Sequence, residues 1–280
     1  MADSSGISSA TKVLEIGAEP AALRQWLRAV WEHRAVLSML ARKDFQVRYK
    51  RASLGVLWAV AVPLLQAAVL AVVFSHLVRV PTKVPYAPLV FAGTVCWSYF
   101  NSATVTSVPA IVDGSSLTDK VWFPRALLPI VPCLANLVGF GVSLAALLVI
   151  VPFLGAPVTP WLLVLLPATL LMVAFTVALG LVLSALDVYF RDVKFLVTAV
   201  LLVWIYVTPV VYPQSALKHL GPWLDFNPMT GIVDLFHLAV LGPVEAWHRA
   251  VIVTGVAIVV LFLAGIEAHR RYDRLFVDLL

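Results

Sequence analysis

A cluster of basic side chains stands directly before a long apolar run. The cluster consists of Arg42, Lys43, Arg48, Lys50 and Arg51. The apolar run from Leu54 to Val73 contains no charged residue. Guanidinium and ammonium groups make charge-assisted hydrogen bonds with phosphate oxygens, so the cluster could hold an acidic lipid headgroup. The same charges also favour the cytoplasmic side of a membrane, so a plain topology anchor is the alternative interpretation.

Two acidic residues share a polar loop and raise the question of catalysis. Asp113 and Asp119 lie in the loop 113–125, and Lys120 follows the second of them. A membrane glycosyltransferase needs acidic residues gathered at one face for a metal ion or a general base. This spacing beside a lysine fits a solvated, protein-binding surface better. The aromatic pair Trp122-Phe123 near the end of the loop could enter a cleft of a soluble motor protein.

Aromatic side chains could supply a path for sugars. The candidate residues are Trp97, Tyr99, Phe100, Trp204, Tyr206 and Tyr212. Aromatic faces accept the C–H side of a sugar without formal charge, so an uncharged path would let a long polymer slide. Trp and Tyr are also enriched at membrane interfaces, and a simple interfacial role stays open.

Several kinds of function are disfavoured by what the sequence omits. The apolar spans carry no Asp, Glu, Lys or Arg, which argues against a proton-driven carrier. The sequence has no G-x-x-x-x-G-K-[ST] phosphate loop, so we expect no ATP hydrolysis by this chain and no enzymatic activity. Cys96 and Cys133 lack metal-ligand spacing, and His219, His237 and His248 are scattered, so no metal site is predicted.

The composition indicates an integral membrane protein. Of the 280 residues, 61% are hydrophobic and 12% are charged, whereas a soluble domain has about 25% charged residues. The net charge of +5 does not indicate nucleic-acid binding, because the basic residues lie between apolar runs, where they set topology and attract anionic lipid.

The apolar pattern predicts an all-α integral membrane protein with six transmembrane helices. The expected spans are 54–75, 87–112, 126–151, 161–186, 195–211 and 250–266. Both termini then lie on one side. Of the 20 Lys and Arg residues, four lie on the opposite side: Arg79, Lys83, Lys218 and Arg249. This asymmetry predicts a multi-pass protein of the cytoplasmic membrane with cytoplasmic N- and C-termini.

The chain before the first span divides into two parts. Residues 1–19 are polar and rich in Ser and Ala, and they predict a disordered cytoplasmic leader without a signal peptide. Residues 20–51 combine an amphipathic helix, predicted from Pro20 to about residue 40, with the basic junction. The helix fits the membrane interface, a soluble partner, or both. The six-helix domain is expected over residues 52–280.

The stretch between the fifth and sixth spans has a different character. Residues 212–247 contain Pro213, Pro222 and Pro228, and their apolar pieces are too short to span a bilayer. Broken helices at membrane depth occur where protein or a water-filled cavity covers them. We therefore expect re-entrant outer gate helices between helices five and six.

Four motifs occur in order along the chain. The first is Arg48-Tyr49-Lys50 with Ser53-Leu54-Gly55, Leu57-Trp58 and Pro63; the second is Lys120-Val121-Trp122-Phe123-Pro124-Arg125 with Leu128-Pro129; the third is Tyr189-Phe190-Arg191-Asp192; the fourth is Thr208-Pro209-Val210-Val211-Tyr212, followed by Asn227-Pro228. Together they resemble the membrane subunit of ABC-2 type polysaccharide exporters, which move O-antigen, capsule, teichoic acid or lipid-linked cell-wall galactan. The chain departs from the family pattern in one place, since the family often has one more residue between Ser53 and Leu54.

The resemblance implies a homodimer of this chain with two copies of a separate nucleotide-binding ATPase subunit. ATP and Mg would reside on that partner, with no cofactor in this chain. The residues expected to couple to the ATPase are Asp113, Asp119, Lys120, Phe123, Pro124, Arg125, Tyr189, Arg191 and Asp192. The pathway would lie between the protomers, lined largely by the first and fifth spans. The outer gate residues would be Pro213, Pro222, Asn227 and Pro228.

These observations lead to one functional hypothesis with two alternatives. We expect the transmembrane subunit of an ATP-driven exporter of a lipid-linked polysaccharide. The lipid pyrophosphate would enter at Arg48, Tyr49, Lys50 and Arg51. The alternatives are an ABC-2 exporter of a small drug or lipid and a membrane scaffold that transports nothing.

Overall fold

The structure is a computed structural model, and it describes residues 23–50, 52–73, 84–118, 123–214, 221–243 and 247–272. Within these ranges every regular element is helical, as the composition predicts. The helices are α1 (Leu23–Glu32), α2 (Arg34–Tyr49), α3 (Trp58–Val72), α4 (Tyr86–Ser107), α5 (Ala110–Asp113), α6 (Ser115–Thr118), α7 (Leu127–Ile150), α8 (Leu165–Tyr189), α9 (Val193–Val207), α10 (Gly221–Leu224), α11 (Pro228–Leu241) and α12 (His248–Tyr272). Short 3-10 turns lie at Gly55–Leu57, Val151–Leu154 and Pro160–Val164.

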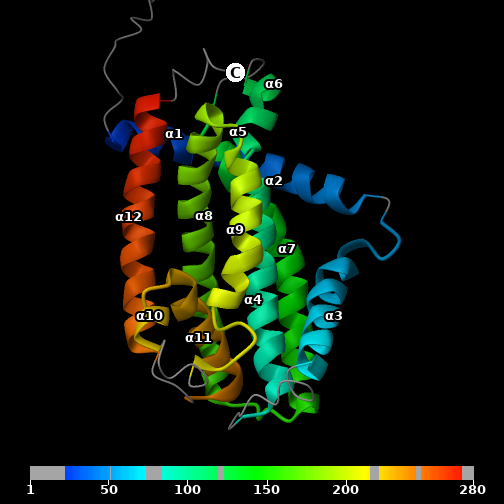
Figure 1. Cartoon of the computed structure of the whole chain (residues 1–280). Helices are drawn as coiled ribbons and strands as arrows, with labels where there is room; N and C mark the ends of the chain where they lie inside the picture. Colours follow the sequence, from blue (N-terminus) through cyan, green and yellow to red (C-terminus); the bar gives the residue numbers. More distant parts are fainter. Residues whose placement is uncertain are drawn as a thin grey trace, which may run out of the picture.

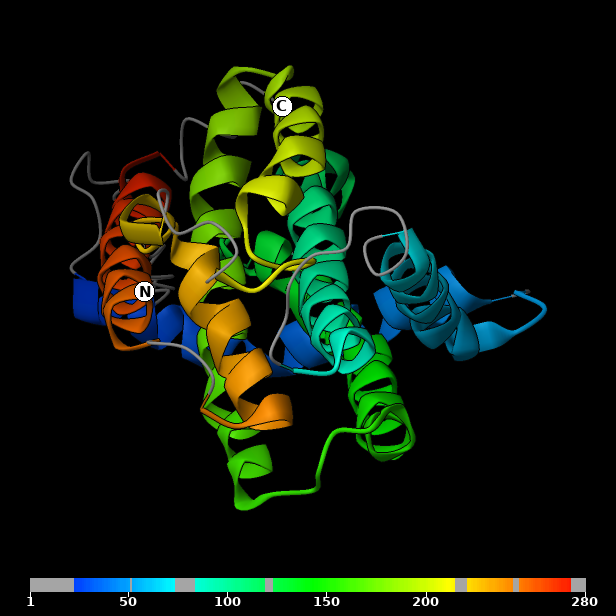
Figure 2. The ribbon, with the colours of Figure 1, turned by 60° about the horizontal axis from the view of Figure 1, so that its bottom comes forward.

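The long helices run side by side, and the short ones cover their ends (Figure 1). Helices α3, α4, α7, α8, α9 and α12 stand roughly parallel, with α3 and α12 on opposite sides of the molecule (Figure 1). Helices α1, α2, α5 and α6 lie at one end, and α10 and α11 lie at the other. Figure 2 shows that α11 crosses the end of the bundle between α12 and α4. The predicted basic junction and the predicted gate are therefore at opposite ends.

Four segments are long and apolar enough to cross a membrane within the described ranges. They are Gly55–Val72, Leu127–Leu154, Pro160–Tyr189 and His248–Arg271. Helix α4 has 22 residues but contains several Ser, Thr and Asn side chains, and α9 has 15 residues. The membrane-spanning class is thus supported, whereas the count of six crossings stays a prediction.

The amphipathic segment forms two helices rather than the one predicted helix. The chain leaves helical geometry at His33, where φ is −88° and ψ is 13°. The His33 ring donates from Nδ1 to the Ala29 carbonyl at 2.7 Å. Helix α2 then continues through the basic region to Tyr49, and Lys50 ends it in an extended conformation. The basic side chains therefore extend from a helix.

Two predicted boundaries are wrong because of proline. The predicted second span reaches residue 112, but α4 ends at Ser107, since Pro109 has no amide hydrogen to continue the helical ladder. The predicted fifth span reaches residue 211, but α9 ends before Thr208, which is extended. Thr208 precedes Pro209, and a residue before proline disfavours helical geometry.

The sixth helix extends beyond its predicted end. Helix α12 continues to Tyr272 rather than ending at residue 266. Glu267 forms ion pairs with Arg270, at 2.8 Å, and with Arg271 on the next turn. Pairs at this helical spacing stabilise a helix where the apolar pattern stops.

Helix α4 lies at the centre of the core, and its contacts need a glycine. A Cβ at Gly93 would lie 2.4 Å from the backbone oxygen of Val210. The segment after α9 therefore packs directly on the α4 backbone. Phe100 on α4 is fully buried and contacts Trp97, Phe175 and Trp204, with ring centroids 5.4 to 5.7 Å apart.

Candidate functional site

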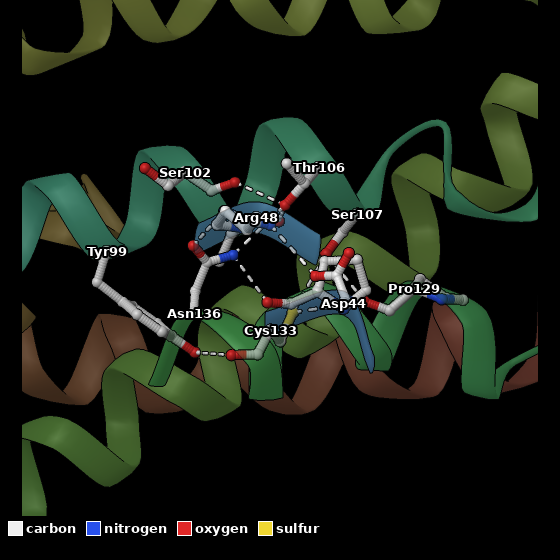
Figure 3. A network of polar contacts seen from close by, with 11 residues as sticks. Asp44, Arg48, Tyr99, Ser102, Thr106, Ser107, Pro129, Cys133 and Asn136 are labelled. Carbon is white, nitrogen blue, oxygen red and sulfur yellow. Dashed lines mark hydrogen bonds and ion pairs between the residues drawn. The ribbon is translucent and has the colours of Figure 1, made fainter. Parts of the chain in front are cut away.

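A polar network joins the last turn of α2 to α4 and α7 (Figure 3). Arg48 donates from Nη1 to Oδ1 of Asn136 at 2.7 Å and from Nη2 to Asp44 at 3.3 Å. Asp44 lies one turn before Arg48 on α2, whereas Asn136 lies on α7. The guanidinium group thus ties the basic helix to the bundle.

Asn136 extends the hydrogen-bond network to α4. Its amide Nδ2 donates to the Pro132 carbonyl at 2.8 Å and to the Thr106 hydroxyl at 3.5 Å. Thr106 donates in turn to the Ser102 carbonyl at 2.7 Å. Asn136 therefore uses both ends of its amide, which fixes the direction of the Arg48 side chain.

A cavity of about 260 Å³ lies beside this network. Four helices contribute to its wall. The polar and aromatic side chains in the wall include Arg48 and Tyr49 from α2, Trp58 from α3, Ser98, Tyr99 and Ser102 from α4, and Asn136 and Phe140 from α7. The lining combines hydroxyl, amide and guanidinium groups with aromatic rings, and no acidic side chain belongs to it.

Only some of the residues predicted for lipid entry border the cavity. Arg48 and Tyr49 both border the cavity, while Lys50 is exposed at the end of α2. Arg51 lies outside the described residues. Only part of the basic cluster therefore borders the cavity, and its role in lipid entry stays a prediction.

Sequence reasoning missed Asn136, which accepts from Arg48 inside the bundle, and the two serines that line the cavity beside it. Asn136, Ser98 and Ser102 come from apolar segments far away in the sequence. The available signal is their spacing, since Ser98 and Ser102 stand one turn apart and share a helical face. Polar residues on one face of an otherwise apolar span indicate a cavity or an interface rather than lipid contact.

The residues expected to couple to an ATPase fall into a buried and an exposed group. Phe123, Pro124 and Arg125 are buried, and Phe123 packs in a cluster with Ile111 of α5 and Val188 of α8. The Arg125 Nη1 atom is buried without a hydrogen-bond partner in the described chain. These side chains shape the end of the bundle from within.

The exposed group lies at the turn between α8 and α9. Tyr189, Arg191 and Asp192 are exposed there, and Asp113 is exposed at the end of α5. The buried Asp187 carboxylate accepts the Lys194 amide at 3.1 Å and holds the turn. Because α5 packs on α8, the two predicted inner loops meet at one end. Asp119 and Lys120 lie outside the described residues.

The predicted pathway aromatics occupy three different settings. Trp97 and Phe100 are buried, and with Trp204 they contact one another inside the bundle. Tyr99 borders the cavity, and its hydroxyl donates to the Cys133 carbonyl at 3.1 Å. Tyr206 is 62% exposed on α9.

Asn227 connects the aromatic core to the predicted gate. Its Oδ1 accepts from Nε1 of Trp204 at 3.0 Å and from the Met229 amide at 3.1 Å. Its Nδ2 donates to the Thr208 hydroxyl at 2.9 Å. Asn227 thus caps the start of α11 and attaches that helix to the end of α9.

The remaining gate residues lie around this cap. Pro228 is the first residue of α11, where its fixed φ suits a helix start. Pro213 borders a small cavity of about 30 Å³ together with Asp234 and His237, and Tyr212 donates to the Tyr206 carbonyl at 2.9 Å. Pro222 lies in α10. In the part of the chain that the structure covers, no three His, Cys, Asp or Glu residues gather at a metal-binding distance.

Comparison with known proteins places the chain in a family. The family described as ABC-2 type transporter matches residues 35–241. An O-antigen export system permease protein RfbA of Myxococcus xanthus is 32% identical over 75% of this chain and 82% of its own length. A protein of the same name from Klebsiella pneumoniae is 27% identical over 88% of this chain and 95% of its own length. The chain therefore belongs to the ABC-2 type transporter family.

Proposed function

We propose that this chain is the transmembrane subunit of an ATP-driven exporter that moves a lipid-linked polysaccharide across the cytoplasmic membrane. The observation that carries the proposal is its likeness to the two O-antigen export permeases, which extends over most of both chains. The polar cavity at the end of α2 supports it, because Arg48 offers a phosphate-binding group beside a path into the bundle.

The drive would come from a separate ATPase subunit at the end formed by α5 and α6. The exposed side chains Tyr189, Arg191 and Asp192 would make the contact, together with Asp113. The buried cluster around Phe123 would transmit the movement, since a packed cluster moves with its helices. In this arrangement ATP binding shifts α5 and α6, and the shift reaches α4, α7 and α8.

Two copies of the chain would enclose the pathway. Helices α3 and α9 both present large exposed apolar side chains, including Trp58 and Leu65 on α3 and Val203 and Tyr206 on α9. Such faces suit lipid, a second copy, or a polymer path between copies. We place the pathway there and the outer gate at α10 and α11.

The test is co-purification from membranes in a mild detergent, scored for ATP hydrolysis. We expect an ATPase subunit in equal amount with this chain, and hydrolysis that rises when a lipid-linked polysaccharide is added. A homogeneous preparation without an ATPase would contradict the proposal and favour a scaffold. Hydrolysis stimulated by small lipids or drugs, but not by the glycan, would identify a different cargo.

A further inference from the structure

The cavity beside Arg48 contains hydroxyl groups that the protein does not use. Thr106 and Ser143, from α4 and α7, both donate to backbone carbonyls at 2.7 Å. The hydroxyls of Tyr49, Ser98 and Ser102 have no hydrogen-bond partner in the described part of the chain. All three residues border the same cavity. The site therefore keeps three free hydroxyl groups on two helices.

These partly buried hydroxyls can pair with a polar occupant of the cavity. A hydroxyl removed from bulk water without a partner costs about 1–3 kcal/mol, and serine in a helix can avoid that cost by donating to the preceding turn. Ser98 and Ser102 do not do so. The cavity of about 260 Å³ exceeds by far the roughly 30 Å³ that one water molecule fills in the liquid. It has room for a ligand of several heavy atoms.

The lining limits the chemistry of that ligand. Tyr99, Phe140 and Trp58 supply aromatic surface, and the free hydroxyls can each donate and accept. This combination fits the two sides of a sugar ring, of which one bears C–H groups and the edge bears hydroxyls. An apolar molecule would leave the hydroxyls unpaired. A free phosphate would use Arg48 and leave the rings uncovered.

Arg48 supplies the second half of the recognition. Its guanidinium group has five N–H donors, and Asn136 and Asp44 take one each. Three donors remain, and Arg48 borders the cavity. A sugar inside the cavity would thus have a phosphate-binding group directly beside it.

We propose that this cavity binds the first sugar of a lipid-linked glycan, with the adjoining phosphate at Arg48. The site lies within one protomer, between α2, α3, α4 and α7, whereas the proposed pathway follows the exposed faces of α3 and α9. The inference rests on the proposed function, and it adds the position where the cargo is first recognised. It assigns Ser98 and Ser102 as residues that form hydrogen bonds with the sugar hydroxyls.

Cysteine labelling tests the proposal, because both native cysteines are fully buried. Ser102→Cys, and separately Ser98→Cys, would be treated with a small hydrophilic thiol reagent in the full-length permease. The control variant is Ser38→Cys, whose site is exposed on α2 outside the cavity. The probes are a polyprenyl diphosphate carrying one hexose, the same polyprenyl diphosphate without sugar, and vesicles of phosphatidylglycerol.

We expect both cavity cysteines to be labelled, and the hexose-bearing lipid alone to protect them. At a ligand concentration about ten times the dissociation constant, labelling should slow by about tenfold, because roughly one site in eleven is then empty. Labelling at Ser38→Cys should not change. Adding Ser98→Ala to Ser102→Cys should weaken the protection.

Other results would overturn the inference in distinguishable ways. Equal protection by the sugar-free diphosphate or by phosphatidylglycerol would identify a phosphate or lipid site without sugar recognition. Absence of labelling would mean that the cavity is closed to water. If no probe protects the cysteines while the glycan still stimulates ATP hydrolysis, the proposed function survives and the sugar site does not. If the glycan gives neither stimulation nor protection, both fail.

Discussion

The Arg48 side chain connects helix α2 with a polar site inside the bundle. Replacing Arg48 with Ala removes the donor to Asn136 and one phosphate-binding group together. Loss of a charged hydrogen bond costs about 2 kcal/mol, so we expect roughly thirtyfold weaker capture of the lipid-linked glycan. The measurement is glycan-stimulated ATP hydrolysis at a series of glycan concentrations.

Lys50→Ala is the matched control for this prediction. It removes the same charge two residues away, from a side chain that is exposed and does not border the cavity. A topology anchor would suffer equally from both changes and would lower the amount of inserted protein. Equal loss of activity in both variants, in proportion to membrane level, would contradict a binding role for Arg48.

Asn227 should matter for stability rather than for cargo binding. Asn227→Ala removes the cap of α11 and the acceptor of the Trp204 indole. Loss of an N-cap costs about 1 kcal/mol, and the unpaired indole adds to it, so the thermal unfolding midpoint in detergent should fall. Asn227→Asp keeps an oxygen that can accept from the Met229 amide, so this variant should recover part of the loss. An unchanged midpoint in both variants would contradict this role.

The buried cluster around Phe123 joins helices at the end of the bundle near α5. Phe123→Ala would leave a void in the cluster that joins α5 to α8, at a cost of about 3–5 kcal/mol. We expect the ATPase subunit to remain bound but its hydrolysis to lose stimulation by glycan. Arg191→Glu, on an exposed side chain, should instead weaken ATPase association and leave permease stability unchanged. Co-purification yield and unfolding midpoint separate the two effects; normal coupled turnover in both variants would contradict the assignment.

The sequence predicts the helices well where composition decides and poorly where single contacts decide. The apolar runs near Gly55, Leu127, Pro160 and His248 are visible because the bilayer demands length and hydropathy. The break at His33 depends on one local conformation, and no apolar pattern reports it. The end of α12 depends on the ion pairs of Glu267, whereas the ends of α4 and α9 follow from Pro109 and Pro209.

The site could be predicted only in part, because its partners come from distant segments. Arg48 is recognisable from its position before an apolar run. Its bond to Asn136 joins residues 88 positions apart, and nothing local to either residue indicates it. The aromatic residues show the opposite case: Trp97 and Phe100 resemble pathway residues in the sequence, but they pack into the core of the chain.

The whole assembly is expected to place α9 of one copy near a second copy. Val203, on the exposed face of α9, would be replaced with Cys, and membranes would be treated with a bis-maleimide. The matched control is Leu263→Cys on α12, which is equally exposed but belongs to another side of the bundle (Figure 1). We expect a cross-linked dimer for Val203→Cys alone. The same yield for Leu263→Cys would indicate random collision.

Transport in vesicles tests the central claim most directly. The permease and its ATPase subunit would be reconstituted with a lipid-linked polysaccharide, and the glycan reaching the opposite side would be measured with a lectin. The account predicts glycan movement that requires ATP and stops when the ATPase cannot hydrolyse it. Vesicles in which the complex hydrolyses ATP and moves a small lipid, while the polysaccharide stays in place, would contradict the account.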